Sequence, residues 1–400
     1  MKLKRELPDW IDAWVEFMSN SEAPTIYNRW VAVSMIAAVL ERKVFLKWDK
    51  LIYPNFYIIL VGPPAGGKGS AMTCARDILD ECNIQLAADA TTKEKLAIRL
   101  AESKTDFEIM GDIELYKQSA ITIFSDEFTV FLGYGNQEIM PWLCDWYDCK
   151  KKWAYETKNM GDSGVTNLWL NILGGTTPEL LQDVLPRESF GSGLNSRILY
   201  VYAPGRERLI VFPFAKPNQD KEIKLLSEEL QQIGLLKGEF IPDETYLEVW
   251  KKWYPAQRNF TMNNDSRMAG YVGRRPTHVH KLSMVLNASR DGNLLLTSDD
   301  LERAIAFLND MEGRMHKAFA GIGMSKSAPL THSILSFIRM RGEVLKSELH
   351  NQFIFDANEE EMRVALATME ITKMISIIHI KEEKDFLIRY LPSDTSDEPL

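Results

Sequence analysis

The stretch Tyr57–Ser70, with the sequence YIILVGPPAGGKGS, constrains the fold of this 400-residue chain more than any other. It begins with the uncharged apolar run Tyr57–Val61, which is long enough for one buried strand. A glycine-rich segment follows and leads into AMTCARDILDE, which has the pattern of a helix. A strand, a glycine-rich turn, a lysine and a helix in this order are typical of a phosphate-binding P-loop. The sequence therefore predicts an α/β unit built on this strand.

The loop supplies two kinds of phosphate contact. Its glycines allow the backbone to curl, so that successive N–H groups point inward at the N-terminus of a helix, where the helix dipole also favours an anion. Lys68 adds a point charge that can reach the outer phosphates. The predicted nucleotide-binding residues are Gly62, Pro63, Pro64, Ala65, Gly66, Gly67, Lys68, Gly69 and Ser70.

One position departs from the usual P-loop pattern. The magnesium ligand is normally a Ser or Thr directly after the lysine, whereas here Gly69 follows Lys68 and Ser70 comes next. Ser70 is therefore the candidate ligand for Mg²⁺ in the loop, and whether it replaces the usual residue stays open. The GKGS ending resembles the loop of adenylate-kinase-type nucleotide kinases, so the loop alone predicts a nucleoside triphosphate without specifying the reaction.

Composition limits the class of protein. A hydrophobic content of 45% and a charged content of 26% are ordinary for a soluble globular chain, and the length suits two or three domains. The four cysteines form no CxxC pair, the N-terminus has no secretory pattern, and the longest apolar helical stretch, Trp30–Leu40, is too short to cross a bilayer. These features predict a reduced, cytoplasmic protein without a membrane partner. The net charge of −9 neither favours nor excludes nucleic-acid binding, since a ring-shaped motor needs basic charge only along its channel.

A second motif follows the apolar segment Ala120–Ser125, which ends in Asp126 and Glu127. A buried strand that ends in adjacent acidic residues is the Walker B arrangement. Asp126 is expected to hold the Mg²⁺ that bridges the phosphates, directly or through water. Glu127 is expected to orient and deprotonate the attacking water as a general base.

Residues 150–173 read as a β-hairpin that leads into a core strand. Lys150–Lys158 alternates like a strand, a turn follows, and Val165–Leu173 reads as the second strand. Its first strand carries four lysines against one glutamate in an otherwise acidic protein: Lys150, Lys151, Lys152 and Lys158. We interpret them as contacts to nucleic-acid phosphates, and a merely solvated charged hairpin is the alternative.

Two further residues can complete a phosphate site. Thr176 lies at the tip of the strand beside the Walker B strand, where a hydroxyl can bond the γ-phosphate or the attacking water, although the same residues also suit a plain β–α turn. Arg197 directly precedes the apolar strand Ile198–Ala203, so its guanidinium can reach a nucleotide bound by a neighbouring subunit. Arg187 is the second candidate for this arginine finger.

This order of parts resembles AAA+ ATPases, specifically the branch with minichromosome-maintenance and superfamily 3 helicases. The IYPN–strand–VGPP, GGTTPELL and GSGLNSRILYVYA segments resemble replication ATPases of bacteriophages and mobile elements still more closely. The resemblance covers about residues 25–320. It implies an AAA+ P-loop NTPase core, in which a parallel sheet is flanked by helices, with a pre-sensor hairpin and an arginine finger at Ser196-Arg197, and a bacterial host cytoplasm if the protein is phage-encoded.

Residues 212–325 read as mostly helical, and Arg274-Arg275 precedes a helix with an apolar face. In the resembled family this helix belongs to the lid, and its sensor 2 arginine contacts the nucleotide phosphates. Arg274 is the first candidate and Arg275 the second, while two solvent-facing arginines at a helix start are the alternative. His278 and His280 suggest a metal pair, but no third ligand lies near them in the sequence, so we interpret them as structural.

The C-terminal segment, 326–392, has the outline of a winged-helix domain, with three helices and a hairpin, and 393–400 is an acidic tail. Its expected recognition helix begins Glu359-Glu360-Glu361, which should repel phosphates, so binding of a replication partner, or a stabilising role beneath the ring, is favoured over reading of DNA. The remaining boundaries are a helical segment at 1–50, the ATPase core at 51–211 and the lid at 212–325.

The sequence therefore predicts a DNA-dependent ATPase that uses ATP and Mg²⁺. The favoured function is a ring helicase, with a homo-hexamer translocating on single-stranded DNA during phage or mobile-element replication. One alternative is a non-helicase AAA+ loader or replication initiator, which the uncertain magnesium ligand favours slightly. The other is a nucleoside monophosphate kinase, which the GKGS ending suggests but which has no use for the hairpin or the C-terminal segment.

Overall fold

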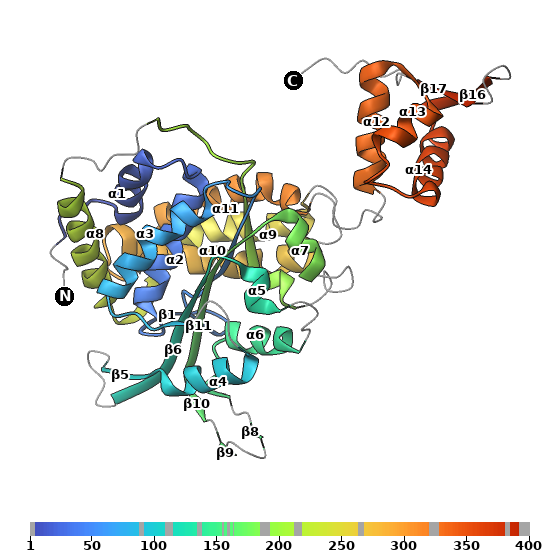
Figure 1. The fold of residues 1–400 in the computed structure, drawn as a ribbon. Coiled ribbons are helices and arrows are strands. Elements are labelled where there is room, and N and C mark those ends of the chain that lie inside the picture. The colour runs from blue at the N-terminus through green and yellow to red at the C-terminus, as the bar shows by residue number, and fades with distance from the viewer. Residues whose placement is uncertain are drawn as a thin grey trace. The chain divides into compact units, whose positions relative to one another are not determined.

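A computed structural model of the chain consists of two compact units, residues 1–320 and 321–400 (Figure 1). The structure describes residues 5–87, 92–108, 115–133, 138–153, 156–157, 161–162, 164–184, 193–211, 218–262, 268–319, 328–380 and 385–391.

The centre of the first unit is a mostly parallel sheet, so the predicted α/β class is confirmed. Its strands follow the order β12-β3-β11-β6-β4, and β5 pairs antiparallel with β6. The strands are β3 (Tyr57–Val61), β4 (Leu86–Ala87), β5 (Lys104–Glu108), β6 (Leu115–Ser125), β11 (Leu168–Thr176) and β12 (Ile198–Tyr202). All of β3 and β11 is buried, as expected for apolar strands with neighbours on both sides.

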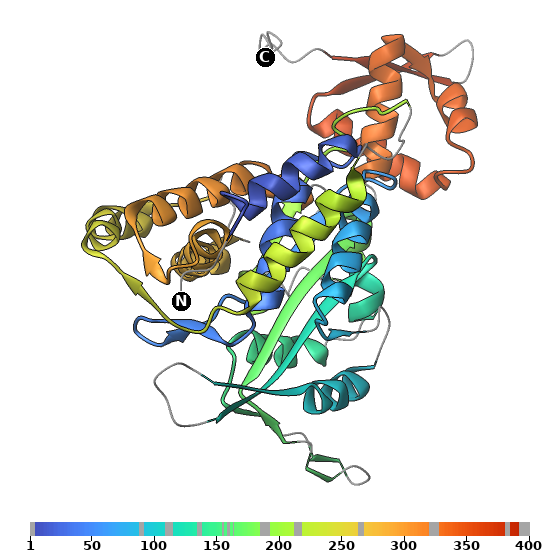
Figure 2. The same cartoon turned by 90° about the vertical axis from the view of Figure 1, so that its left-hand side faces the viewer.

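Helices cover both faces of this sheet. Helix α2 (Thr25–Leu40) is buried on nearly all sides, because its sequence is apolar around the whole helix, and it packs on β3, β11 and β12. Helices α1 (Trp10–Phe17), α3 (Lys68–Glu81) and α8 (Gln219–Gly234) pack against α2 (Figure 2). Two helices, α5 (Phe128–Leu132) and α6 (Ile139–Tyr147), contact β11, and α4 (Lys93–Glu102) contacts β6.

A second, smaller sheet joins distant parts of the sequence within the same unit. Its order is β14-β13-β1-β2, formed by β1 (Val44–Lys47), β2 (Leu51–Ile52), β13 (Gly238–Pro242) and β14 (Leu295–Leu296). Strand β1 pairs in parallel with β13. The N-terminal segment and the expected lid therefore share backbone hydrogen bonds.

The expected lid contains α9 (Glu244–Ala256), α10 (Ala269–Arg290) and α11 (Ser298–Ala318). Helix α10 begins five residues before Arg274 and continues through Pro276, whereas the sequence predicted that the two arginines precede the helix. The proline lies near the start of a long helix whose later turns are almost entirely buried, and that packing compensates for one missing backbone donor.

The hairpin at 150–173 is present in the described residues. Strand β7 (Lys152–Trp153) pairs antiparallel with β10 (Val165–Thr166), and β8 (Glu156–Thr157) pairs with β9 (Gly161–Asp162), further along the projection in Figure 1. Its second strand is shorter than predicted, because Asn167 takes a positive φ of 48° and separates β10 from β11. The core strand therefore begins at Leu168.

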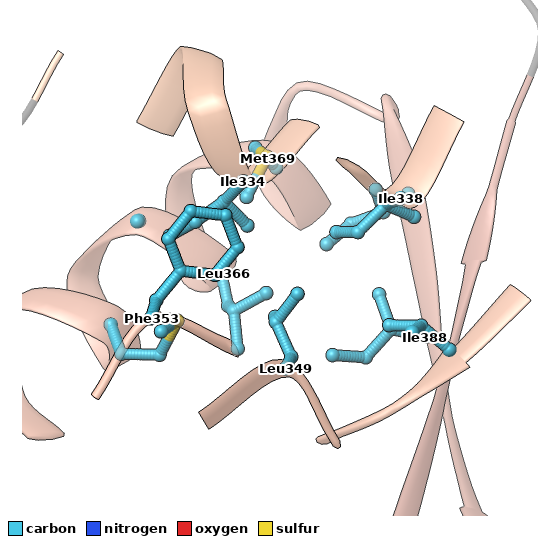
Figure 3. Packing of buried hydrophobic residues seen from close by; sticks show 11 residues of the cluster. Ile334, Ile338, Leu349, Phe353, Leu366, Met369 and Ile388 are labelled. Atoms are coloured by element: carbon cyan, nitrogen blue, oxygen red, sulfur yellow. The ribbon is translucent and has the colours of Figure 1, made fainter. Parts of the chain in front are cut away.

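The second unit consists of three helices and a three-stranded antiparallel sheet. The elements are α12 (Ala328–Arg341), β15 (Glu343–Leu345), α13 (Lys346–Gln352), α14 (Glu359–Ile371), β16 (Ile375–Ile380) and β17 (Asp385–Tyr390). The sheet order is β15-β17-β16. Figure 3 shows its core, where side chains from all three helices meet those of the sheet, among them Ile338, Leu349, Leu366 and Ile388. The three helices and the hairpin match the prediction, and β15 adds a strand to it.

None of the helices in the described ranges combines the length and the apolar character needed to cross a membrane.

Candidate functional site

The P-loop connects β3 to α3 at the carboxyl end of the central sheet. Gly67 caps α3 with a φ of 87°, and Ala65 also takes a positive φ, of 57°. Gly62 lies where no side chain fits: a Cβ there would be 2.3 Å from Tyr27 Oη and 2.6 Å from the carbonyl oxygen of Ala203. The backbone is thus curled as the sequence predicted, with the first turn of α3 directed at the space beside the loop.

Lys68 folds back over the loop. Its Nζ donates to the carbonyl oxygens of Gly62, at 2.7 Å, and Pro63, at 2.9 Å. Burial lowers the pKa of Lys68, while the negative charges of Glu127 and Glu179 oppose that shift. Since neither acceptor is a charged partner, phosphate oxygens would be stronger acceptors for this ammonium group than the two carbonyls.

A cavity of about 560 Å³ lies beside the loop and brings most of the predicted site together. Asp126 and Glu127 are exposed and line it, because β6 ends next to β11 and β11 lies beside β3, so the carboxyl ends of all three strands meet. The lining residues are Glu22, Pro64, Ala65, Gly66, Gly67, Lys68, Gly69, Ser70, Asp126, Glu127, Thr177, Leu180 and Arg206. This set can hold an anion at the loop and a hard cation at Asp126.

The threonine at the tip of β11 differs from the prediction in detail. Thr176 is fully buried, with its Oγ1 3.5 Å from the Thr177 carbonyl oxygen, and it does not belong to the described cavity lining. Thr177 lines the cavity instead, and its Oγ1 accepts a hydrogen bond from the Leu180 N–H at 3.3 Å. Thr177 is therefore the threonine placed to contact a bound group, and the role of Thr176 stays a prediction.

Two cavity residues were missed from the sequence. Arg206 follows β12, and its Nε donates to the Ala65 carbonyl oxygen at 3.0 Å while its guanidinium pairs with Glu22. Glu22 precedes α2. A signal for Arg206 was available, because the carboxyl ends of parallel strands meet at one edge and Arg206 follows the fifth of them. Glu22 had no such signal.

Arg197 and Arg274 lie away from this cavity. Arg197 ends the short helix η3 (Asn195–Arg197) just before β12, whose first residue, Ile198, pairs with Tyr57 at the start of β3. The P-loop begins at the other end of β3, about 16 Å along the strand. Asp148 accepts from Arg197 Nη2 at 2.5 Å and lies 3.5 Å from Arg274 Nη1, so one carboxylate joins both arginines at the amino end of the sheet. The other finger candidate, Arg187, lies outside the described residues.

Arg275 has a different environment from Arg274. Its guanidinium is buried and bonds to Glu312 at 2.6 Å, Asn309 at 2.6 Å and Gln257 at 2.5 Å, and it packs 4.2 Å from the ring centroid of Phe260. These contacts, one from each of Nε, Nη1 and Nη2, hold the guanidinium inside its own subunit. Of the two arginines, Arg274 is the accessible one.

Helix α10 also carries three buried titratable side chains near Arg274, which are Lys281, His278 and His280. Burial and the positive charges of Arg274 and Lys50, opposed by Cys149 and Asp148, lower the pKa of Lys281 to about 7, and its Nζ donates to both oxygens of Asn55, at 2.6 and 2.8 Å. Burial also lowers the pKa of both His278 and His280 to about 3. Both are therefore neutral. Within the described part of the chain no three His, Cys, Asp or Glu side chains gather as a metal site.

The hairpin lysines differ in their surroundings. Lys150, Lys151 and Lys152 are all exposed at the base of the projection, and Lys150 pairs with Asp145 at 2.7 Å. Lys158 lies outside the described residues. Lys151 and Lys152 are thus the exposed lysines of the predicted set for which the described residues show no ion pair.

Two glycines of the site should respond oppositely to alanine. A Cβ on Gly69 meets nothing within 4 Å, whereas a Cβ on Gly175 would lie 2.8 Å from the Asp126 carbonyl oxygen. We expect Gly69→Ala to raise the free energy of unfolding by about 0.5–1 kcal/mol through helix propensity. Gly175→Ala should lower it by about 1–3 kcal/mol through overpacking. Urea unfolding of both variants tests this, and equal destabilisation by the two would contradict the described geometry.

No protein-family model matches the chain, and no curated protein is similar enough in sequence to count as a relative.

Proposed function

We propose that the cavity beside Lys68 binds ATP with Mg²⁺ and hydrolyses it, as in an AAA+ ATPase. The observation that carries this proposal is the convergence of a curled glycine loop, Lys68, Asp126 and Glu127 on one cavity at the carboxyl end of a parallel sheet. The insertion of β11 between the P-loop strand and the acidic strand supports it, since β11 brings Thr177 to the same edge.

Each residue has a distinct task in this reaction. The loop N–H groups and Lys68 bind the β- and γ-phosphates, and Lys68 exchanges two carbonyl acceptors for phosphate oxygens. Asp126, with Ser70 or water, holds Mg²⁺ against the phosphates. Glu127 accepts the proton of a water molecule whose oxygen bonds to the γ-phosphorus, while the bond to the bridging oxygen breaks and ADP and phosphate leave.

The place of the arginines supports an oligomer. Arg197 and Arg274 lie at the amino end of the strands, whereas the cavity lies at the carboxyl end, so they cannot reach the nucleotide of their own subunit without a rearrangement of the sheet. Packing of one subunit's amino edge against the next subunit's cavity would complete the site in a closed ring, for which a hexamer is the proposed size.

The proposed substrate of the motor is single-stranded DNA, contacted by the hairpin at 150–173. The favoured function is a helicase in phage or mobile-element replication that acts in a bacterial cytoplasm. The exposed Lys151 and Lys152 support this interpretation. A loader or initiator shares the same nucleotide site and is the second candidate.

The C-terminal unit is proposed to be a winged helix that binds a replication partner, because acidic residues occupy the first turn of α14.

Charge reversal in the hairpin should weaken DNA binding. We expect the variant Lys151→Glu/Lys152→Glu to lower the affinity for single-stranded DNA and to reduce the slope of log K against log salt by about 1.4, which is about 0.7 for each lost phosphate contact. Fluorescence anisotropy with a labelled oligonucleotide over a range of salt concentrations measures both. The control is Lys221→Glu on α8, which is exposed and distant in the fold. Unchanged affinity and slope would remove the hairpin from the DNA site.

The subunit-sharing proposal has its own experiment. Lys68→Ala disables the nucleotide site of a subunit but leaves its arginines, and Arg274→Ala does the reverse. Each variant alone should release phosphate from ATP slowly, and a mixture of the two should recover a substantial part of the wild-type rate. A mixture that hydrolyses no faster than the two separate variants would refute sharing between subunits.

A further inference from the structure

Asp148 lies between the two arginines at the amino end of the sheet and has no role in the function described so far. It follows the last residue of α6, where the helix C-cap fixes its backbone. Its two carboxylate oxygens face different partners: Oδ2 is 2.5 Å from Arg197 Nη2, and Oδ1 is 3.5 Å from Arg274 Nη1. The shorter distance indicates that Asp148 is held more tightly by Arg197 than by Arg274.

The two arginines also differ in exposure. The Arg197 side chain is 8% exposed, and its Nη1 donates to the Gly193 carbonyl oxygen at 2.7 Å, so it is held by two acceptors inside the protein. The Arg274 side chain is 26% exposed, and within the described part of the chain its polar contact is the long one to Asp148. Arg274 therefore keeps donors available to a ligand, while Arg197 is committed to its own subunit.

The surroundings carry an excess of positive charge. Arg274, Lys50, Lys281 and Thr277 line a cavity of about 170 Å³ together with Asp148. Asp148 is the single acidic side chain among the described residues of this lining. Lys281 is hydrogen-bonded to Asn55 and its pKa is lowered to about 7, so Arg274 and Lys50 carry most of the positive charge of this cavity near neutral pH. Such a pocket suits a phosphate group that approaches from outside the subunit.

We propose that Asp148 is a positioning residue that, anchored by Arg197, orients Arg274 toward the γ-phosphate held by a neighbouring subunit. In this arrangement Arg274 contacts the phosphate, and Arg197 acts through Asp148. The contact to Asp148 engages Nη1 of Arg274, so the remaining guanidinium donors can form a bidentate pair with a phosphate while Asp148 holds the side chain. The inference rests on the proposed sharing of the ATP site between subunits, and it changes the role of Arg197 from finger to anchor.

The test uses the mixture of full-length Lys68→Ala and Arg274→Ala subunits, in which the Lys68→Ala subunit donates the arginines. Adding Asp148→Asn to the donor should lower the kcat of the mixture about 10- to 100-fold, because the guanidinium is displaced from its productive position. The KM for ATP should stay unchanged, since the other subunit's loop binds the nucleotide. Asp148→Glu in the donor should restore part of the rate. Asp145→Asn, one turn earlier on α6, is the matched control and should change nothing.

A second comparison separates anchor from finger. Arg197→Ala in the donor should cost the same factor as Asp148→Asn, and the donor with both changes should be no worse than either, because both act on one orientation. The inference is overturned if the mixture with the Asp148→Asn donor hydrolyses ATP as fast as the parent mixture. It is also overturned if the kcat losses of Asp148→Asn and Arg197→Ala multiply in the double variant, or if the KM for ATP rises while kcat stays unchanged. Failure of the parent mixture, with no Asp148 change, would refute subunit sharing itself and this inference with it.

Discussion

Lys68→Ala is expected to lower the rate of ATP hydrolysis about 100- to 1,000-fold, the range found when one preorganised donor to a developing charge is removed. Lys68 and Arg206 are the cationic side chains among the described cavity residues, and Arg206 is paired with Glu22. Without Lys68, the acidic side chains Asp126 and Glu127 dominate the site and repel a triphosphate. Equilibrium binding of ATP should weaken together with kcat.

The thermal stability of the Lys68→Ala variant should not fall together with its rate of ATP hydrolysis. Burial lowers the pKa of Lys68 because desolvation disfavours its charged form, and its bonds among the described residues are to the loop carbonyls of Gly62 and Pro63. The thermal midpoint of Lys68→Ala should therefore be equal to that of the wild type or higher. Phosphate release and a thermal melt measure the two quantities, with Lys221→Ala on α8 as the lysine control. Hydrolysis at the wild-type rate would exclude the P-loop as the catalytic site.

Glu127→Gln is expected to separate binding from chemistry. The change keeps the size of the side chain but removes the proton acceptor, so kcat should fall about 100- to 10,000-fold. Glu127 lines the cavity and its charge acts on Lys68, so removing it also removes a repulsion of the triphosphate. The KM for ATP should therefore not rise, and the protein should retain bound ATP. Single-turnover hydrolysis and nucleotide retention after gel filtration test this.

Two neighbouring acids provide the controls for that result. Glu179 also acts on the charge of Lys68 but does not belong to the described cavity lining, so Glu179→Gln should leave kcat within a few-fold of the wild type. Asp126→Asn should instead raise the Mg²⁺ concentration needed for activity, since its predicted role is to hold the ion. If Glu127→Gln raised KM and left kcat intact, Glu127 would be a binding residue and another group would be the base.

Three parts of the carboxyl edge, the P-loop, Lys68 and the acidic pair, could be predicted from the sequence, because their signals are local. The strand before the loop, the glycines around Lys68 and the acidic pair after β6 each lie within a few residues of their element. Parallel strands bring the segments that follow them to one edge of the sheet, whatever the length and path of the connections between the strands. The same rule would have found Arg206 after β12.

The amino edge could not be predicted, because its contacts join positions far apart in the sequence. The Asp148–Arg197 pair spans 49 positions and the Asp148–Arg274 pair spans 126. A charge pattern does not show which of two arginines is buried, so Arg197 looked as accessible as Arg274. Strand β5 was also missed, since Lys104, Thr105 and Asp106 are polar and exposed and give no apolar alternation.

Phosphate release from ATP, measured beside oligomeric mass with and without single-stranded DNA, tests the central claim most directly. We expect the protein to release inorganic phosphate from ATP, faster with DNA, and only in the assembled fraction, because the arginine that lines each cavity, Arg206, is paired with Glu22 and the proposed catalytic arginine comes from a neighbouring subunit. Release of phosphate at the same rate from monomers would contradict the shared site. An assembled protein that releases none, or that transfers the phosphate to a nucleoside monophosphate, would contradict the proposed hydrolysis.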